Sequence, residues 1–209
     1  QKKVLDEFSC KKCGSINTKK TSDKGWITEF DTSLNKTIKI AKSLPVLIVY
    51  TCKGKRYQKK PDRNDILLIS KIKDFNCQYF YPTYQLENGY NTKQPIDSHG
   101  LTNVHLFFTK RNLIALAFLN KLIEESKISN KLKFILTGML KRSTKLNRIH
   151  VKNFFFGGGG WNAGGLAGTL YVPAMQVETS ILEQLSTKIK SLVRANALLL
   201  NKYRNLTST

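Results

Sequence analysis

The sequence predicts an α+β protein, with a small β region first and a mainly helical region after it. Three observations support this. Short β-rich runs separated by turn residues fill the first 60 residues. From residue 109 onward, apolar residues recur with the period of a helix. A glycine-rich loop near residue 160 precedes a long C-terminal helix. We therefore expect two domains, residues 1–76 and residues 77–209.

The β region is predicted to hold three short strands around a cysteine turn. The runs at residues 26–30, 37–40 and 46–52 are rich in β-branched and aromatic residues. Residues 46–50 (VLIVY) are apolar throughout, so we expect them to form the buried strand. A helix should begin after Asp62, because Asp62 can cap it and Asp65 lies near its positive end.

Two further helices are predicted at residues 109–125 and 129–148. In the second, apolar residues lie at 132, 135, 136, 139 and 140, which is one face of a helix. At 100° per residue, Lys141, Lys145 and Arg148 fall on the opposite face. This pattern predicts a basic ridge, or alternatively an ordinary amphipathic helix with lysines in solvent.

The last segment is predicted to contain a loop, a strand and a helix. Glycine is too costly to order for residues 157–165 to form regular structure. Residues 169–172 (TLYV) indicate a strand. Ser180 and Glu183 have the spacing of a capping box, and a long amphipathic helix follows from Ile181.

The charge is strongly positive and uneven. The chain has 35 Lys and Arg against 14 Asp and Glu, a formal net charge of +21. No Asp or Glu occurs from residue 126 to residue 177. An acid-free stretch of this length is typical of a surface that approaches phosphates, although a compositional preference for lysine would also raise the charge. No apolar leader or membrane-spanning run is present, so we expect a cytoplasmic protein without a membrane partner.

Four cysteines, Cys10, Cys13, Cys52 and Cys77, are candidate ligands of a structural zinc ion. Cys10 and Cys13 form a CxxCG turn, as in half of a zinc ribbon, so we describe the β region as zinc-ribbon-like. A second CxxC is missing because position 55 is Lys55, and Cys77 is the remaining candidate for a fourth ligand. A degenerate knuckle without metal and a disulfide are the alternatives.

Motifs for catalysis are scarce. The three histidines are far apart in the sequence and have no evident nucleophile beside them. Residues 156–160 (FGGGG) fit FxGxG, a methyltransferase cofactor-loop pattern, but that loop should follow a buried strand and be followed by an acidic residue. We interpret the glycines as a loop that lets Trp161 and Asn162 approach a nucleic acid. A disordered tether is the alternative.

Several segments, in order, resemble one family. They are residues 99–117 (HGLTNVHLFFTKRNLIALA), 137–140 (TGML) and 166–173 (LAGTLYVP), together with the knuckle at 10–14 (CKKCG). This set resembles the target-recognition insert of bacterial site-specific DNA methyltransferases of the N4-cytosine/N6-adenine amino-methylase group, which belong to restriction-modification systems.

The resemblance implies a DNA-reading segment and not a complete enzyme. In that family the insert lies between the S-adenosylmethionine loop and a catalytic motif with adjacent prolines, and no two prolines here are neighbours. No catalytic residue is therefore carried over, and S-adenosylmethionine is expected only in the parent enzyme. The expected partners are double-stranded DNA and the catalytic domain of the same parent chain. Whether the chain is an excised segment or a separate subunit stays open.

Nine residues are candidate DNA contacts. Basic side chains would grip phosphates, whereas amide and aromatic side chains would approach bases. The phosphate candidates are Lys141, Arg142, Lys145, Arg148 and Lys152, and the base or groove candidates are Asn153, Trp161, Asn162 and Arg111. Arg111 lies beside a predicted helix start, where it could instead anchor the fold. The alternative function is a ribosomal-type or other structural RNA-binding protein with a zinc-ribbon-like start, which charge and cysteines would suit equally well.

Overall fold

The computed structural model describes residues 7–18, 21–22 and 25–207, with side chains as far as residue 200. The chain forms two compact units, residues 1–44 and residues 45–209. The expected boundary between residues 76 and 77 rests on composition and stays a prediction.

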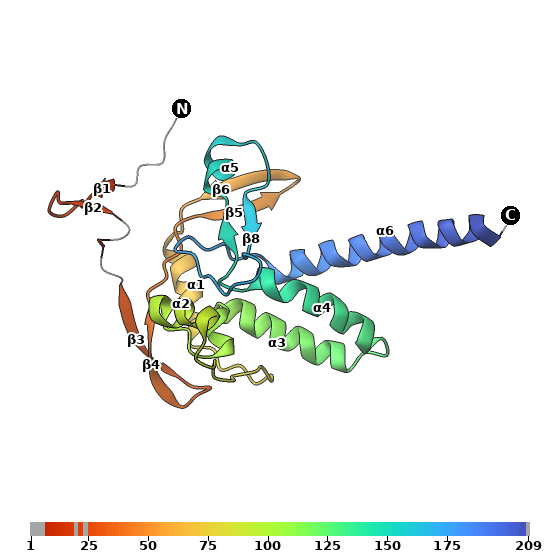
Figure 1. Ribbon diagram of the computed structural model, residues 1–209, viewed down its shortest axis with the longest axis horizontal. Helices are drawn as coiled ribbons and strands as arrows, with labels where there is room; N and C mark the ends of the chain where they lie inside the picture. Colours follow the sequence, from red (N-terminus) through yellow and green to blue (C-terminus); the bar gives the residue numbers. More distant parts are fainter. Residues whose placement is uncertain (1–6, 19–20, 23–24, 208–209) are drawn as a thin grey trace. The chain divides into compact units, whose positions relative to one another are not determined.

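The described residues form a mixed α+β structure, as the sequence predicts (Figure 1). Its strands associate in four antiparallel pairs. The pairs are β1 (Glu7–Ser9) with β2 (Ile16–Thr18), β3 (Trp26–Asp31) with β4 (Lys36–Ala41), β5 (Ile48–Cys52) with β6 (Lys55–Lys59), and β7 (Arg148–Ile149) with β8 (Asn162–Gly164). The helices are α1 (Arg63–Lys73), α2 (Tyr90–His99), the 3-10 helix η1 (Val104–Phe107), α3 (Lys110–Glu124), α4 (Ser129–Ser143), α5 (Val151–Phe156) and α6 (Ile181–Thr207).

In the first unit, β3 and β4 confirm the predicted strands at residues 26–30 and 37–40. Their turn is closed by Asp31, whose carboxylate accepts hydrogen bonds from the backbone N–H groups of Ser33 and Leu34 at 2.8 and 3.1 Å. Asn35 completes the turn with a φ of 50°, a left-handed conformation that asparagine tolerates better than most residues. The expected turn residues therefore do form the hairpin.

The prediction that residues 46–50 form a buried strand is wrong. β5 begins only at Ile48, Val46 is 73% exposed, and Tyr50 is 44% exposed. Among the described residues the strand pairs with β6 alone, and every residue from Tyr50 to Gln58 is exposed. An apolar run shows that a strand is possible, but burial requires a partner layer that only the tertiary structure supplies.

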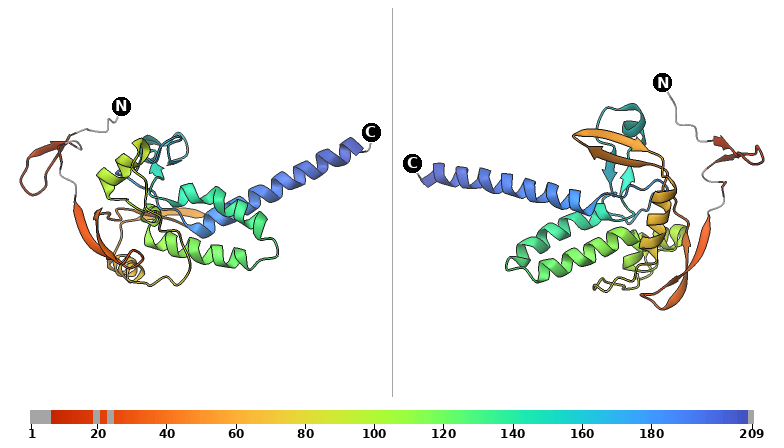
Figure 2. Two further views of the ribbon diagram at one scale, coloured as in Figure 1. Left: turned by 60° about the horizontal axis from the view of Figure 1, so that its bottom comes forward. Right: turned by 180° about the vertical axis from the view of Figure 1, so that it is seen from behind.

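The core of the second unit lies between α3, α4 and α6. Met139 is completely buried and packs with Leu116, Ile135 and Ile181. The predicted helical stripe on α4 is therefore confirmed at positions 132, 135, 136 and 139, whereas Leu140 is exposed. Burial of a residue like Met139 contributes about 2 kcal/mol. Beyond this core, α6 extends away from α3 and α4 (Figure 2), and its Val193 is 63% exposed.

The prediction that the second helix reaches residue 148 is wrong, because α4 ends at Ser143. Thr144 is extended and bridges to Phe108, and the backbone N–H of Lys145 donates to the carbonyl of Phe107 at 2.7 Å. These tertiary hydrogen bonds replace helical ones. Lys145 and Arg148 therefore lie beyond the helix, and the predicted three-residue ridge on one helix face does not form.

The segment around the glycines differs from expectation in two ways. Residues 162–164 form β8, so the stretch from 157 to 165 is not wholly irregular. Residues 169–172 do not form a strand. Instead, the side-chain amide of Gln94 accepts from the N–H of Val172 at 2.9 Å and donates to its carbonyl at 3.2 Å. The side chain of Gln94, in α2, thus makes the two backbone hydrogen bonds that a neighbouring strand would otherwise make with Val172.

Helix starts agree with their sequence signals at α1 and α6, whereas α2, η1 and α5 are not predicted. Asp62 caps α1, and Asp65 returns the bond to the backbone N–H of Asp62 at 2.9 Å, which completes a capping box. At α6, the N–H of Glu183 reaches the Ser180 hydroxyl at 3.4 Å. Thr109 caps α3, which begins where the helix at residues 109–125 is predicted. Residues 90–99 form α2, which places a buried Pro95 inside the helix.

Candidate nucleic-acid interface

The glycine loop is held at both ends by its own neighbours. His150 donates its backbone N–H to the carbonyl of Trp161 at 2.6 Å. Its ring Nδ1 accepts from the N–H of Asn153 and caps α5. The side-chain amide of Asn153 then donates to the carbonyl of Gly160 at 2.9 Å. Gly157 turns the chain out of α5 with a φ of 76°, a conformation that favours glycine. These contacts favour a fixed loop over the tether alternative.

Trp161 lies at the centre of an aromatic and cationic cluster. Its ring meets Phe154 edge to face, with 5.7 Å between ring centres. On its face sits Arg56, with the guanidinium carbon 5.0 Å from the centre of the ring. Arg56 comes from β6, so the exposed β5–β6 hairpin and the glycine loop belong to one surface (Figures 1 and 2). Such cation–π contacts are worth about 0.5–1 kcal/mol at exposed sites.

Sequence reasoning missed Arg56 as a site residue. A signal was present, because residues 45–60 contain five basic residues and no acidic one. This basic signal was overlooked because residues 46–50 were expected to form a buried strand. The tertiary structure therefore brings together parts of two acid-free stretches, the β5–β6 hairpin from residues 45–60 and the glycine loop from residues 126–177.

The predicted site residues divide into those around the loop and those elsewhere. Lys152, Asn153, Trp161 and Asn162 lie on α5, the loop and β8. Lys152 is exposed, whereas Asn162 turns its side-chain oxygen toward the N–H of Gly164. Asn153 uses its amide nitrogen to close the loop, which gives it a structural role beside the predicted one.

The basic residues near the end of α4 have varied surroundings. Lys141 donates to the carbonyl of Leu166 at 3.0 Å, and Arg142 is exposed. Lys145 is half-buried. Arg148 lies in β7 with a buried Nε that finds no hydrogen-bond partner among the described residues. Of these, Arg142 is the most accessible to a phosphate.

Arg111 is engaged within the fold. Its Nε donates to a carboxylate oxygen of Glu178 at 2.8 Å. This pairing favours the anchoring alternative for Arg111. The residue also borders an apolar cavity of about 500 Å³ between α1 and α3, where Phe75, Tyr79 and Phe118 form much of the lining.

The cysteine knuckle adopts a tight turn. The N–H of Gly14 donates to the carbonyl of Cys10 at 2.8 Å, and Gly14 has a φ of 74°. Cys13 lies 3.2 Å from the Ser15 hydroxyl, and this hydrogen bond lowers the pKa of the Cys13 thiol. The turn therefore presents two thiols, and the Cys13 thiol deprotonates more readily than an unperturbed cysteine.

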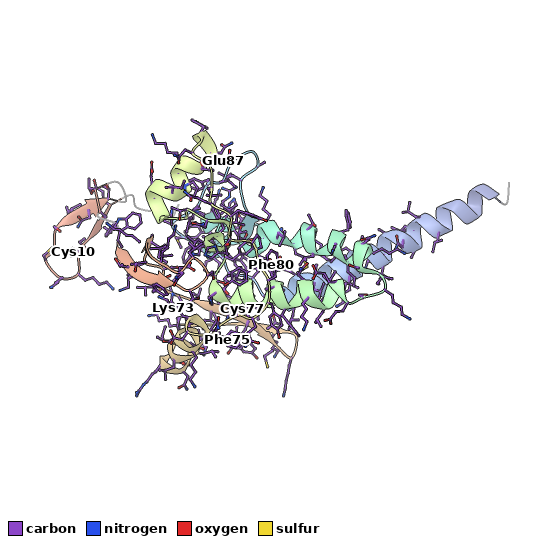
Figure 3. All side chains as sticks on the ribbon, turned by 90° about the horizontal axis from the view of Figure 1, so that it is seen from below. Cys10, Lys73, Phe75, Cys77, Phe80 and Glu87 are labelled. Atoms are coloured by element: carbon purple, nitrogen blue, oxygen red, sulfur yellow. The ribbon has the colours of Figure 1, made fainter. Side chains whose placement is uncertain are left out.

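Cys52 and Cys77 belong to the second unit. Cys52 ends β5, and Cys77, labelled in Figure 3, follows α1. The thiol of Cys77 faces the carbonyl of Tyr79 at 3.7 Å. All four cysteines are free thiols. Within the described ranges, no three His, Cys, Asp or Glu residues gather in a way that could hold a metal ion.

Comparison of the chain with protein-family models, curated protein sequences and solved structures finds no match in any of the three. Among the described residues, no helix has the length and apolar character needed to cross a membrane.

Proposed function

We propose that this chain is a DNA-binding target-recognition segment of an S-adenosylmethionine-dependent DNA methyltransferase of the restriction-modification type. It would read duplex DNA in the cytoplasm for a catalytic domain of the same parent. Such enzymes extrude the target base from the stack, so recognition of the surrounding duplex can be assigned to a separate segment. The ordered resemblance at residues 99–117, 137–140 and 166–173 supports this family.

One observation carries the DNA-binding part of the proposal, namely the contact between Arg56 and Trp161. It joins the hairpin that carries Lys53, Lys55 and Arg56 to the glycine loop that follows α5, the helix on which Lys152 lies. Phosphate oxygens attract such a surface, and the missing carboxylates remove the repulsion that would oppose approach. The aromatic ring adds a group that can stack on or pack against bases.

Duplex binding at two salt concentrations tests this function. We expect the affinity of the chain for a labelled 30-base-pair duplex to fall about tenfold or more between 50 and 200 mM NaCl. The double variant Arg142→Glu/Lys152→Glu should abolish measurable binding, because both side chains are exposed predicted phosphate contacts. The control Lys127→Glu/Lys131→Glu makes the same change of net charge near the α3–α4 turn and should bind almost normally. An affinity that is independent of salt would refute the proposal.

Competition separates the DNA function from the RNA alternative. An unlabelled duplex should displace the labelled one more effectively than a structured RNA hairpin of equal length. The opposite order would favour the ribosomal-type function. We also expect no heat of binding with S-adenosylmethionine, because the FGGGG loop follows α5 and not a strand.

The zinc-ribbon-like description and the structural zinc belong to the same proposal. The tight turn of the knuckle suits a pair of zinc ligands at Cys10 and Cys13, and Cys52 and Cys77 would complete a four-thiolate set. Zinc bound there would stabilise the fold and take no part in chemistry. Elemental analysis of protein purified without added metal should give one zinc per chain, reduced in Cys10→Ser. A substoichiometric value in the unaltered chain would instead indicate a degenerate knuckle.

A further inference from the structure

The β5–β6 hairpin is a rigid structure that contributes little to the core. Every residue from Tyr50 to Gln58 is exposed. An isolated two-stranded ribbon is only marginally stable in water, so its order needs local support. Lys53 and Gly54 have φ values of 48° and 76°, the pair of positive angles typical of a tight type I′ turn.

Two more contacts hold the ribbon. Tyr50 and Tyr57 face each other across the strands and stack with 5.5 Å between ring centres. At its base, Lys59 forms ion pairs with Asp62 and Asp65 at 2.9 and 2.8 Å, which tie the ribbon to the start of α1. A hairpin that is ordered, exposed and outside the core is suited to contact another molecule.

The two faces of the ribbon differ in chemistry. Directly opposed residues share a face, so Thr51 and Arg56 point to one side together with Gln58. Arginine, glutamine and threonine are side chains that hydrogen bond to base edges in DNA. Tyr50 and Tyr57 lie on the other face, and Lys53 at the turn and Lys55 beside it bring positive charge to the tip.

The polar groups of this face are available. Arg56 contacts Trp161 through the face of the ring, which leaves its N–H donors unused in this part of the chain. Lys53, Lys55 and Arg56 form no ion pair within the described residues, because the nearby carboxylates pair with Lys59. Trp161 thus holds the guanidinium in position, and no hydrogen bond among the described residues uses its donors.

We propose that the β5–β6 ribbon enters the major groove of duplex DNA. In this arrangement Thr51, Arg56 and Gln58 face the base edges, and Lys53 and Lys55 contact phosphates. The proposal rests on the proposed DNA-binding function and adds the groove and the reading residues. The major groove is about 12 Å wide, admits a two-stranded β-ribbon and distinguishes all four base pairs, whereas the minor groove, about 6 Å wide, presents a degenerate pattern of donors and acceptors.

Methylation footprinting with dimethyl sulfate tests the groove. The reagent methylates guanine N7 in the major groove and adenine N3 in the minor groove, so one reaction reports on both. With the full chain at saturation on a 30-base-pair duplex of mixed sequence, we expect protection of guanine N7 and unchanged reactivity at adenine N3. Protection confined to adenine N3 would overturn the proposal.

A variant without the reading side chains tests their role. Thr51→Ala/Arg56→Ala/Gln58→Ala removes one positive charge but leaves Lys53 and Lys55, so it should retain its duplex affinity at low salt within about threefold, because phosphate contacts supply most of that affinity, and lose the guanine N7 protection. The control Asn130→Ala/Lys131→Ala, on exposed positions of α4, makes the same change of charge and should retain both. Full N7 protection in the ribbon variant would overturn the proposal and leave the DNA-binding function standing. Failure of the unaltered chain to bind any duplex would refute both.

Discussion

Arg56 and Trp161 lie in contact, with the guanidinium carbon 5.0 Å from the centre of the indole ring, although they belong to segments far apart in the sequence. The contact joins the β5–β6 hairpin to the glycine loop. In the proposed function, the hairpin and the glycine loop therefore form one DNA-facing surface.

This contact should be detectable as an energetic coupling in DNA binding. In a double-mutant cycle of Arg56→Ala and Trp161→Ala, we expect the two losses of binding free energy to differ from additivity by about 0.5–1 kcal/mol. Fluorescence anisotropy with a labelled duplex measures all four affinities. Strict additivity, with circular dichroism unchanged, would mean that the pair does not act as a unit.

The closure of the glycine loop can be tested with two adjacent glycines. A Cβ at Gly159 would come within 2.9 Å of the side-chain nitrogen of Asn153, whereas one at Gly160 would meet nothing within 4 Å. Gly159→Ala should therefore break the hydrogen bond from Asn153 to the carbonyl of Gly160 and cost about 1 kcal/mol of unfolding free energy. Chemical denaturation measures this, and equal stability of the two variants would contradict the proposed closure.

Asn147 should be important for stability. It is fully buried, and its side-chain amide donates to the backbone carbonyl of Val177 at 2.9 Å. The backbone carbonyl of Asn147 in turn accepts a hydrogen bond from the N–H of Val177. Asn147→Ala leaves the Val177 carbonyl unpaired and should lower the free energy of unfolding by about 1–3 kcal/mol. Asn130→Ala, at an exposed position, is the matched control for a urea titration. A similar midpoint for both variants would show that the buried amide is dispensable.

Met139 provides a test of the helical core. Met139→Ala would leave a cavity between α3, α4 and α6 and should cost about 2–5 kcal/mol. Leu140→Ala is the control, because Leu140 is the next residue on α4 and is 37% exposed. Thermal unfolding followed by circular dichroism should show a much larger loss at position 139, and the reverse order would contradict this packing.

The base of the ribbon should respond to pH at both extremes. The hydrogen bonds that the Lys59 ammonium donates to Asp65 and Asp62 raise the pKa of Lys59 from 10.5 to about 12, so the contribution of this group to stability is complete below pH 10.5 and disappears as the pH rises through 12. The backbone N–H of Asp65 and the Lys59 ammonium lower the pKa of Asp62 below 3.8, so that contribution is lost as the pH falls through the lowered value.

Asp62→Asn separates the charge from the helix cap. Asparagine caps a helix about as well as aspartate, so this variant should keep α1 but lose the acid-dependent part of the stability. The thermal midpoint of the unaltered chain should therefore fall more steeply than that of the variant below pH 3.8. Parallel curves for the two proteins would exclude a role for this ion pair.

Sequence patterns were sufficient to predict features that depend only on interactions between neighbouring residues. The cap at Asp62, the turn at Asp31 and the stripe that buries Ile135 and Met139 were all predicted from neighbouring residues. Signals that depend on a distant partner were misread. Residues 46–50 looked like a core strand, and Arg148 was placed on a helix that ends at Ser143.

The candidate site was predicted in part for the same reason. Trp161 and Lys152 followed from an acid-free, glycine-rich stretch, because charge and glycine content are properties of the sequence itself. Arg56 could not follow, because a cation–π contact between segments so far apart depends on how the hairpin packs on the loop.

By itself, the sequence determined the α+β class, the positions of α1, α3, α4 and α6, the β3–β4 hairpin and the uneven positive charge, since each of these follows from residues close together in the chain. The tertiary structure alone decided that Val46 and Tyr50 of the apolar 46–50 run lie exposed, that Gln94 replaces a strand beside Val172, and that Arg56 meets Trp161. Burial and long-range pairing depend on which surfaces the folded chain brings together, and no local pattern encodes that choice.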